Sequence, residues 1–238
     1  MPASLVVPGR DDVRVVVSHR VDGDFSLKRV SAGELDGHRR RLVDLPWTQL
    51  QEDHGTECVF VEAPGAGDGD IGDILATSLT DTVLGIWTGD CAPVCLAGDR
   101  AVVALHAGWR GLRDGVLPAA VEAMGRMGDV VRSVVVGPRI GPCCYEFGRS
   151  DLDDMKRLFG PGVESLDAHG RPSLDVGACI TNGLRASLGR DVMTHIDPSC
   201  TGCDDSLFFS HRRRGEVERH VMAVWIELSG SRSIAGGR

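Results

Sequence analysis

Three residues of the sequence have side chains that bind transition metals and stand where strands are expected to begin or end. Cys91 follows a predicted strand in the string TGDCAP, His106 ends the predicted strand Ala101–His106, and His54 lies in another strand-flanking turn, EDHGTE. Consecutive strands are often neighbours in a sheet, so residues at their ends come close together. One thiolate and two imidazoles suit zinc and leave a fourth position open, which is typical of a catalytic zinc site.

The elements that must position these residues are short apolar strands and amphipathic helices. Runs of apolar and β-branched residues predict strands, and apolar residues at helical spacing predict helices. The predicted strands are Val13–Ser18, Cys58–Val61, Thr82–Trp87, Val94–Ala97, Ala101–His106, Val130–Val136, Val192–His195 and Val221–Leu228. The predicted helices are 31–45, 112–127, Leu152–Phe159 and Val176–Leu188, and loops rich in turn residues are predicted over Pro64–Asp73 and Cys200–Asp205.

The order of these elements indicates the fold class. Strands outnumber helices and do not alternate strictly with them, so we predict an α/β single-domain layered sandwich with a mixed β-sheet. One catalytic domain is expected over residues 1–228, and the tail 229–238, SGSRSIAGGR, is expected to be disordered.

Composition narrows the function classes. The 238 residues carry a formal net charge of −8 and no long basic run, so no nucleic-acid partner is expected. No apolar segment has the length that spans a bilayer, and the N-terminus does not resemble a signal peptide, so we expect no membrane association and a cytoplasmic location. In that reducing compartment the eight cysteines are better explained by metal binding or catalysis than by four disulfides.

Four strings, in this order, give the sequence a resemblance to a known family: TGDCAPVCLAG, LHAGWRG, VGPRIGPCCYEFG and LFFSHRR. They resemble the YfiH-like, or laccase-domain, family over about Val13–Leu228, and the resemblance implies a YfiH-like fold. The family's metal ligands are a His in a Q-x-H-G string, a Cys in an A-D-C string and the His of HAGWRG, which map onto His54, Cys91 and His106. Here the first two strings read QEDHG and GDC, and an N-terminal S-x-R-x-G-G string appears as SHRVDG.

The resemblance also implies an activity on small molecules. Members were first named polyphenol oxidases and later purine nucleoside phosphorylases, which implies phosphorolysis of adenosine, inosine and methylthioadenosine together with deamination of adenosine. Zinc lowers the pKa of a bound water to about 7, which provides a hydroxide for attack on the purine C6. Phosphorolysis needs a phosphate dianion held against the ribose C1′, for which guanidinium groups are suited.

Five further residues are candidates for the site. Arg110 of HAGWRG is the first candidate for phosphate binding, and Arg20 and Arg212 are additional candidates. Asp90 either accepts a hydrogen bond from a ligand histidine and fixes its tautomer or simply forms the turn. Cys144 either points toward the site or packs in the core.

The remaining cysteines carry no predicted function. Cys200-Thr-Gly-Cys203 is a CxxC string, but a redox or zinc site would need a thioredoxin-like context or a second CxxC, and neither is visible. We therefore interpret Cys203 as incidental and Cys95 as a core residue.

Other functions remain open. A multicopper oxidase needs paired His-x-His motifs, which the eight histidines do not form, although one copper ion fits the same three ligands. A cysteine hydrolase acting on peptidoglycan precursors would use Cys91 as nucleophile and His106 as base, and would not need His54. A non-enzymatic protein with a structural zinc would need a fourth protein ligand.

Overall fold

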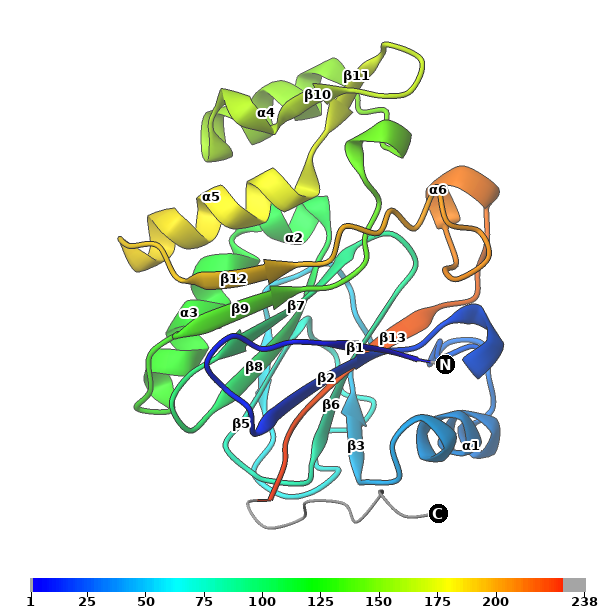
Figure 1. Cartoon of the computed structure of the whole chain (residues 1–238), viewed down its shortest axis with the longest axis vertical. Helices are drawn as coiled ribbons and strands as arrows, with labels where there is room; N and C mark the ends of the chain where they lie inside the picture. Colours follow the sequence, from blue (N-terminus) through cyan, green and yellow to red (C-terminus); the bar gives the residue numbers. More distant parts are fainter. Residues whose placement is uncertain (1, 229–238) are drawn as a thin grey trace, which may run out of the picture.

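A computed structural model describes residues 2–228 and shows two β-sheets stacked between helical layers (Figure 1). The first sheet has the order β1-β2-β13-β6-β3, formed by β1 (Ala3–Leu5), β2 (Val13–Val17), β13 (His220–Ile226), β6 (Val83–Thr88) and β3 (Trp47–Gln49). The second sheet has the order β12-β9-β7-β8-β5-β4, formed by β12 (Met193–Ile196), β9 (Ser133–Val136), β7 (Ala92–Ala97), β8 (Val102–Ala107), β5 (Ile74–Thr77) and β4 (Cys58–Phe60). Both sheets are mixed, since each contains parallel and antiparallel pairs.

A dry core fills the space between the two sheets. Side chains alternate across a strand, so every second residue of the central strands faces the opposite sheet. Val15 of β2 and Met222 of β13 belong to this core from the first sheet, and Cys95 of β7 and Ala104 of β8 belong to it from the second. Cys95 is fully buried, which agrees with its interpretation as a core residue.

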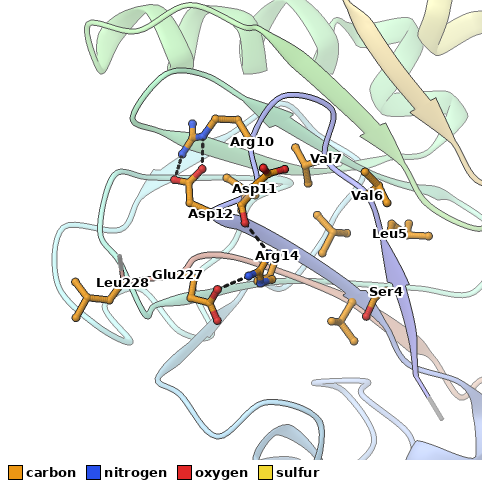
Figure 2. A pocket seen from close by; sticks show the side chains of 13 residues that line it. Ser4, Leu5, Val6, Val7, Arg10, Asp11, Asp12, Arg14, Glu227 and Leu228 are labelled. Atoms are coloured by element: carbon orange, nitrogen blue, oxygen red, sulfur yellow. Dashed lines mark hydrogen bonds and ion pairs between the residues drawn. The ribbon is translucent and has the colours of Figure 1, made fainter. Parts of the chain in front are cut away.

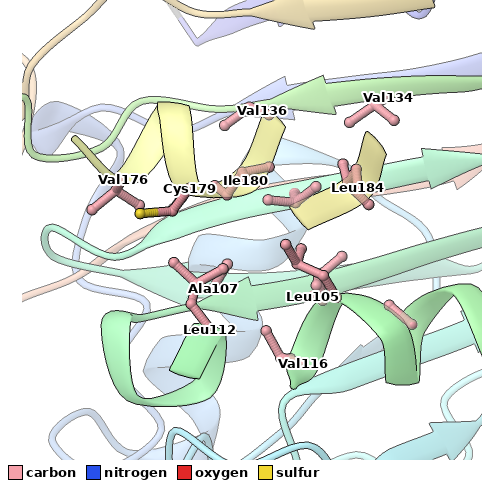
Figure 3. Close-up of a cluster of buried hydrophobic side chains, with 14 of the residues drawn as sticks. Leu105, Ala107, Leu112, Val116, Val134, Val136, Val176, Cys179, Ile180 and Leu184 are labelled. Carbon is pink, nitrogen blue, oxygen red and sulfur yellow. The ribbon is translucent and has the colours of Figure 1, made fainter. Parts of the chain in front are cut away.

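Helices cover the outer face of the second sheet. They are α2 (Trp109–Asp114), α3 (Val116–Arg126) and α5 (Val176–Leu188), with α4 (Arg149–Phe159) packed on α5. In Figure 3, Leu105 of β8, Val116 of α3 and Ile180 of α5 face one buried cluster. A short hairpin of β10 (Glu164–Leu166) and β11 (Pro172–Leu174) follows α4.

Helix α1 (Ala32–Leu42) covers the outer face of the first sheet. Its N-cap is Ser31, whose hydroxyl accepts a hydrogen bond from the Glu34 N–H, as is typical of helix starts. Leu35 of α1 packs with Trp47 of β3 in a third buried cluster. The described helices include none that is both long and apolar enough to cross a bilayer.

The structure confirms the predicted α/β class and layered arrangement, and it differs from the prediction in detail. The sequence predicted one mixed sheet, but the strands form two stacked sheets. The predicted helix 112–127 is instead two helices, because Gly115 has a left-handed φ of 101° that ends α2 and begins α3. The loop ending at Asp73 leads into β5, which the sequence analysis did not predict. The proposed tail 229–238 lies outside the described residues.

Candidate metal centre

The cysteine and one histidine of the predicted ligand set lie together because β7 and β8 are antiparallel neighbours. Cys91 directly precedes β7, and His106 is the second-to-last residue of β8, where it is paired with Pro93. The beginning of one strand therefore adjoins the end of the other, as the sequence predicted. One ligand atom each from His54, Cys91 and His106 lies within 4.8 Å of the others.

His54 reaches this point from a loop that follows β3 of the first sheet. Its Nε2 lies 3.9 Å from Sγ of Cys91, and its ring centroid lies 4.9 Å from that of His106, with the two planes at 76°. The backbone of His54 has a φ of 66°, which is uncommon for a residue with a side chain and is maintained only by surrounding contacts.

Asp73 supplies the contacts that position both histidines. Its Oδ1 lies 2.7 Å from Nδ1 of His106, which leaves Nε2 of that ring for a metal. The same carboxylate accepts hydrogen bonds from the backbone N–H groups of Asp53, His54 and Gly55, at 3.2, 3.1 and 2.7 Å. A carboxylate that orients a ligand imidazole is a common feature of metal sites. The sequence analysis missed Asp73, although its place directly before the apolar run ILAT was a usable signal.

Asp90 does not have the orienting role that was considered for it. Its Oδ1 accepts hydrogen bonds from the hydroxyls of Thr201 and Ser210, both at 2.7 Å, and its Oδ2 accepts one from the N–H of Arg212 at 2.6 Å. Its oxygens are therefore engaged by these loops instead of by His106, and its backbone φ of 144° lies in the region that favours glycine. Asp90 thus connects the turn before Cys91 to the start of the short helix α6 (His211–Arg214), which carries Arg212.

Gly108 allows the chain to pass close to the ligands. A Cβ at this position would lie 2.8 Å from Cδ2 of His54 and 3.0 Å from Sγ of Cys91. Real Cβ atoms essentially never make contacts under 3.0 Å, so a side chain here would force the His54 ring to shift and would crowd Cys91. The first glycine of HAGWRG is therefore required by the geometry of the site.

The electrostatics favour a charged thiolate. Burial disfavours the Cys91 thiolate, but the His106 and His54 imidazoles outweigh this effect and lower the pKa of Cys91 to about 6. Burial also opposes protonation of His106, but the negative charges of Glu52 and Cys91 and the hydrogen bond with Asp73 raise the His106 pKa. The thiolate is the form of cysteine that binds metals.

Glu52 is a second acidic residue of the site that the sequence analysis missed. Its carboxyl group lies 3.8 Å from Nδ1 of His106 and accepts a hydrogen bond from the N–H of Trp87. Burial is the largest influence on this group and raises the pKa of Glu52 to about 8. The neighbouring Gln51 is exposed and binds only the carbonyl of Gly69, so it is directed away from the ligands.

The ligands line a cavity of about 540 Å³ that contains several cationic side chains. Arg110, Arg212 and Arg219 line it, and the guanidinium of Arg110 has no ion-pair or hydrogen-bond partner within residues 2–228. Arg20 lies outside it, contrary to expectation. Its guanidinium is paired with Glu216 at 2.7 Å and stacked over Phe209, so it supports the wall.

Aromatic rings form the other part of the cavity wall. Trp87, Trp109 and Tyr145 line it, and Arg212 stacks over the Tyr145 ring at 4.7 Å. Flat rings beside guanidinium groups suit a ligand with one aromatic and one anionic part. Cys144, which was considered as a pocket residue, does not line this cavity but a separate one.

His54, Cys91 and His106 thus form a possible metal-binding site whose donor set fits a borderline-soft ion. Two nitrogens and one sulfur converge, Nδ1 of His106 is occupied by a carboxylate, and the free side faces the cavity. No fourth His, Cys, Asp or Glu joins this group among residues 2–228, so the structural-zinc alternative lacks the closed ligand set it needs.

A larger cavity, of about 640 Å³, lies at the β1 edge of the first sheet (Figure 2). Its charged groups pair with one another, because Arg10 donates to Asp12 at 2.7 Å and Arg14 pairs with Glu227. None of the three ligand residues lines it. Its size therefore does not indicate a competing active site.

Comparison with known proteins shows the family of the chain. A family model described as multi-copper polyphenol oxidoreductase laccase matches residues 36–227. The chain belongs to this family. This confirms the resemblance seen in the sequence, although residues 2–228 contain no cluster of paired histidines of the kind a trinuclear copper centre needs.

Several relatives in the laccase family carry another name. A Mycobacterium tuberculosis protein named purine nucleoside phosphorylase is 35% identical over 182 residues, covering 75% of this chain and 71% of its own. A protein of Geobacillus stearothermophilus named purine nucleoside phosphorylase YlmD is 30% identical over 210 residues, covering 79% and 77%. Among solved structures, Bacillus licheniformis YfiH matches with a TM-score of 0.83 at 22% identity, covering 95% of this chain and 97% of its own. That likeness confirms the YfiH-like fold.

Proposed function

We propose that this protein is a zinc-dependent purine nucleoside enzyme that cleaves nucleosides with phosphate. The observation that carries the proposal is a three-ligand centre, formed by His54, Cys91 and His106, that opens into a cavity with unpaired guanidinium and aromatic walls. Relatives at 30–35% identity that are named purine nucleoside phosphorylase support the same activity.

The cavity residues have separable roles in this reaction. Arg110 and Arg212 bind the phosphate dianion, and the rings of Trp109 and Tyr145 hold the purine and ribose. A phosphate oxygen forms a bond with C1′ of the ribose, the C1′–N9 bond breaks, and its electron pair leaves with the purine, which takes up a proton. Asp90 acts through Arg212, because it fixes the backbone N–H of that residue.

The finer specificity follows the resemblance. Adenosine, inosine and methylthioadenosine are proposed substrates for phosphorolysis, and adenosine is also a proposed substrate for deamination. Zinc, when bound, would supply a Lewis acid and an acidified water, which deamination requires. Glu52, whose burial raises its pKa to about 8, is placed to exchange a proton beside the ligands.

The test combines metal analysis with product analysis. Purified protein is incubated with adenosine with and without phosphate, and ribose 1-phosphate, adenine and inosine are quantified by chromatography. We expect adenine and ribose 1-phosphate only with phosphate, inosine in both conditions, and neither reaction in Cys91→Ala. Full activity in protein stripped of metal would refute the zinc-dependent mechanism, and activity restored by copper but not zinc would favour the copper alternative.

A cysteine hydrolase is the second candidate, favoured by the low pKa of Cys91. Its Sγ lies beside imidazoles, as in a nucleophile–base pair. A dyad of Cys91 and His106 does not need His54, whereas the metal centre does. His54→Ala therefore separates the two: loss of activity together with loss of metal supports the metal enzyme, and retained hydrolysis of peptidoglycan precursors supports the hydrolase.

A further inference from the structure

A second cluster of metal-binding side chains lies outside the site described above. Cys143 and Cys144 come from a short 3-10 turn (Pro142–Cys144) after β9, and Cys200 and Cys203 come from the loop after β12. Their four sulfur atoms lie within 4.8 Å of one another, and none is in a disulfide. The CxxC string that seemed to lack a second pair therefore has one, supplied by two adjacent cysteines nearly sixty positions earlier.

The sulfur positions agree with a tetrahedral metal site. Zinc–sulfur bonds of about 2.3 Å place the sulfurs of a tetrahedral four-thiolate site about 3.8 Å apart. The observed separations are 3.7 Å for Cys143 to Cys200, 3.4 Å for Cys143 to Cys203 and 3.4 Å for Cys144 to Cys203. They are far longer than the bond of about 2.05 Å that joins a disulfide.

The backbone around the cluster is arranged to receive thiolates. The N–H of Gly141 donates to Sγ of Cys200 at 3.1 Å, and the Cys203 N–H donates to the Cys200 carbonyl at 3.0 Å, which forms a tight turn. A Cβ at Gly202 would lie 2.7 Å from Cβ and 3.0 Å from Sγ of Cys144. Glycine is thus needed for the two loops to approach each other.

Two arginine side chains lie beside the cluster, and Arg214 is also paired with Glu216 at 2.8 Å. Arg213 and Arg214 line the cavity next to Cys143, Cys144 and Cys203. Arg214 donates to the carbonyl of Gly202 at 3.1 Å, so its guanidinium is fixed against the CxxC turn. Cations near thiolates favour their charged form.

We propose that Cys143, Cys144, Cys200 and Cys203 bind one structural zinc ion through four thiolates. A closed four-cysteine set leaves no open position, so this ion would take no part in the reaction. It would join two loops that carry the cavity wall, because Tyr145 follows Cys144 directly and Thr201 of the CxxC turn donates to Asp90. The second ion would thereby stabilise the side of the cavity that faces the first.

Zinc content of the full chain tests this proposal independently of the catalytic centre. Wild-type protein is expected to hold two zinc ions per chain by plasma emission spectroscopy, whereas Cys203→Ser and Cys91→Ala are each expected to hold one and the double variant none. Cys58→Ser is the matched control, since Cys58 is a half-buried free cysteine on β4 outside both clusters, and it should keep two. If only the proposed function fails, Cys203→Ser still loses one ion while Cys91→Ala loses none.

Spectroscopy guards against variants that fold poorly. In Cys91→Ala loaded with cobalt(II), a four-thiolate site gives intense sulfur-to-cobalt charge-transfer absorption and tetrahedral ligand-field bands, and Cys203→Ser in the same background should remove most of this absorption. Thiol titration of the denatured protein should give all eight cysteines. Three results would each overturn the proposal. The first is a lower thiol count, which would indicate disulfides. The others are iron bound at the cluster in place of zinc and unchanged zinc content in Cys203→Ser.

Discussion

Replacing Asp73 by asparagine tests whether one carboxylate controls the metal centre. Asp73→Asn keeps the size of the side chain but provides only one acceptor oxygen, whereas the carboxylate accepts from His106 and from three backbone N–H groups. If the amide oxygen takes the place of Oδ1, the amide NH₂ faces the N–H groups of Asp53 and Gly55. If it takes the place of Oδ2, the NH₂ faces Nδ1 of His106 and favours the tautomer with its proton on Nε2, the ligand atom.

Both arrangements weaken metal binding through the positions of His54 and His106. Loss of a partner that orients a ligand histidine reduces metal affinity about 10–100-fold, which corresponds to about 1.4–2.7 kcal/mol. The loss of charge-assisted hydrogen bonds also lowers the free energy of unfolding of the metal-free protein, at about 1.5–3 kcal/mol for each bond. The two effects are separate because affinity is measured on folded protein.

Zinc affinity is measured by competition with a chromophoric chelator, in the Cys203→Ser background so that the four-cysteine cluster does not contribute. Asp70→Asn is the matched control, because Asp70 is exposed and lies three residues earlier in the same loop. We expect the control to bind zinc as tightly as the parent protein. An Asp73→Asn variant that is folded and equals the control in affinity would refute the role of this carboxylate.

Three further outcomes are expected. Arg110→Met should raise the KM for phosphate about 10–100-fold, since a hydrogen bond to a charged group contributes about 1.5–3 kcal/mol. The control Arg113→Met, which removes a second cation over the same Trp109 ring, should leave this KM unchanged. Equal KM values in the two variants would show that Arg110 does not bind the phosphate. Gly108→Ala should abolish zinc binding at the catalytic centre in a folded protein, and normal zinc content would show that the loop can move aside. Burial opposes ionisation of Asp129, but hydrogen bonds from four backbone N–H donors outweigh burial and lower the pKa of Asp129 to about 2. The carboxylate therefore contributes about 2.5 kcal/mol to the free energy of unfolding above pH 4, and this contribution is lost as the pH falls toward 2. Urea unfolding should therefore show Asp129→Asn clearly less stable than wild type at pH 7 and nearly equal to it near pH 2, and a constant difference would contradict this account.

The convergence of Cys91 and His106 could be predicted because both residues stand at strand ends. Cys91 and His106 flank two apolar runs joined by a short turn, and antiparallel pairing of such runs brings those two ends together. Asp73 was missed because the strand that follows it is only four residues long and its partner, β8, comes much later in the chain. Of the two roles considered for Asp90, orientation of a ligand histidine is not observed, because its hydrogen bonds go to a loop more than a hundred residues away.

The four-cysteine cluster could not be predicted from spacing. Adjacent cysteines such as Cys143 and Cys144 lack the C-x₂₋₄-C spacing that is typical of zinc ligands. Only the folded chain shows that they lie beside Cys200 and Cys203. The stacking of two sheets was missed for a related reason. Fully buried strands such as β6 and β8 have apolar residues on both faces, so their sequences do not show which layer lies on which side.

The turn between β6 and β7 passes from one sheet to the other, and this has a mechanical consequence for the metal centre. His54 follows a strand of the first sheet, His106 belongs to the second, and Cys91 lies in the turn that joins them. The three ligands therefore lie at the junction of the two sheets, and Asp73, which directly precedes β5, holds His54 and His106 in position there. A bound ion would cross-link this junction between the two sheets. Hydrogen exchange should therefore slow in β6 and β7 together when metal is added. By the same linkage, packing defects between the sheets should weaken metal binding without touching a ligand.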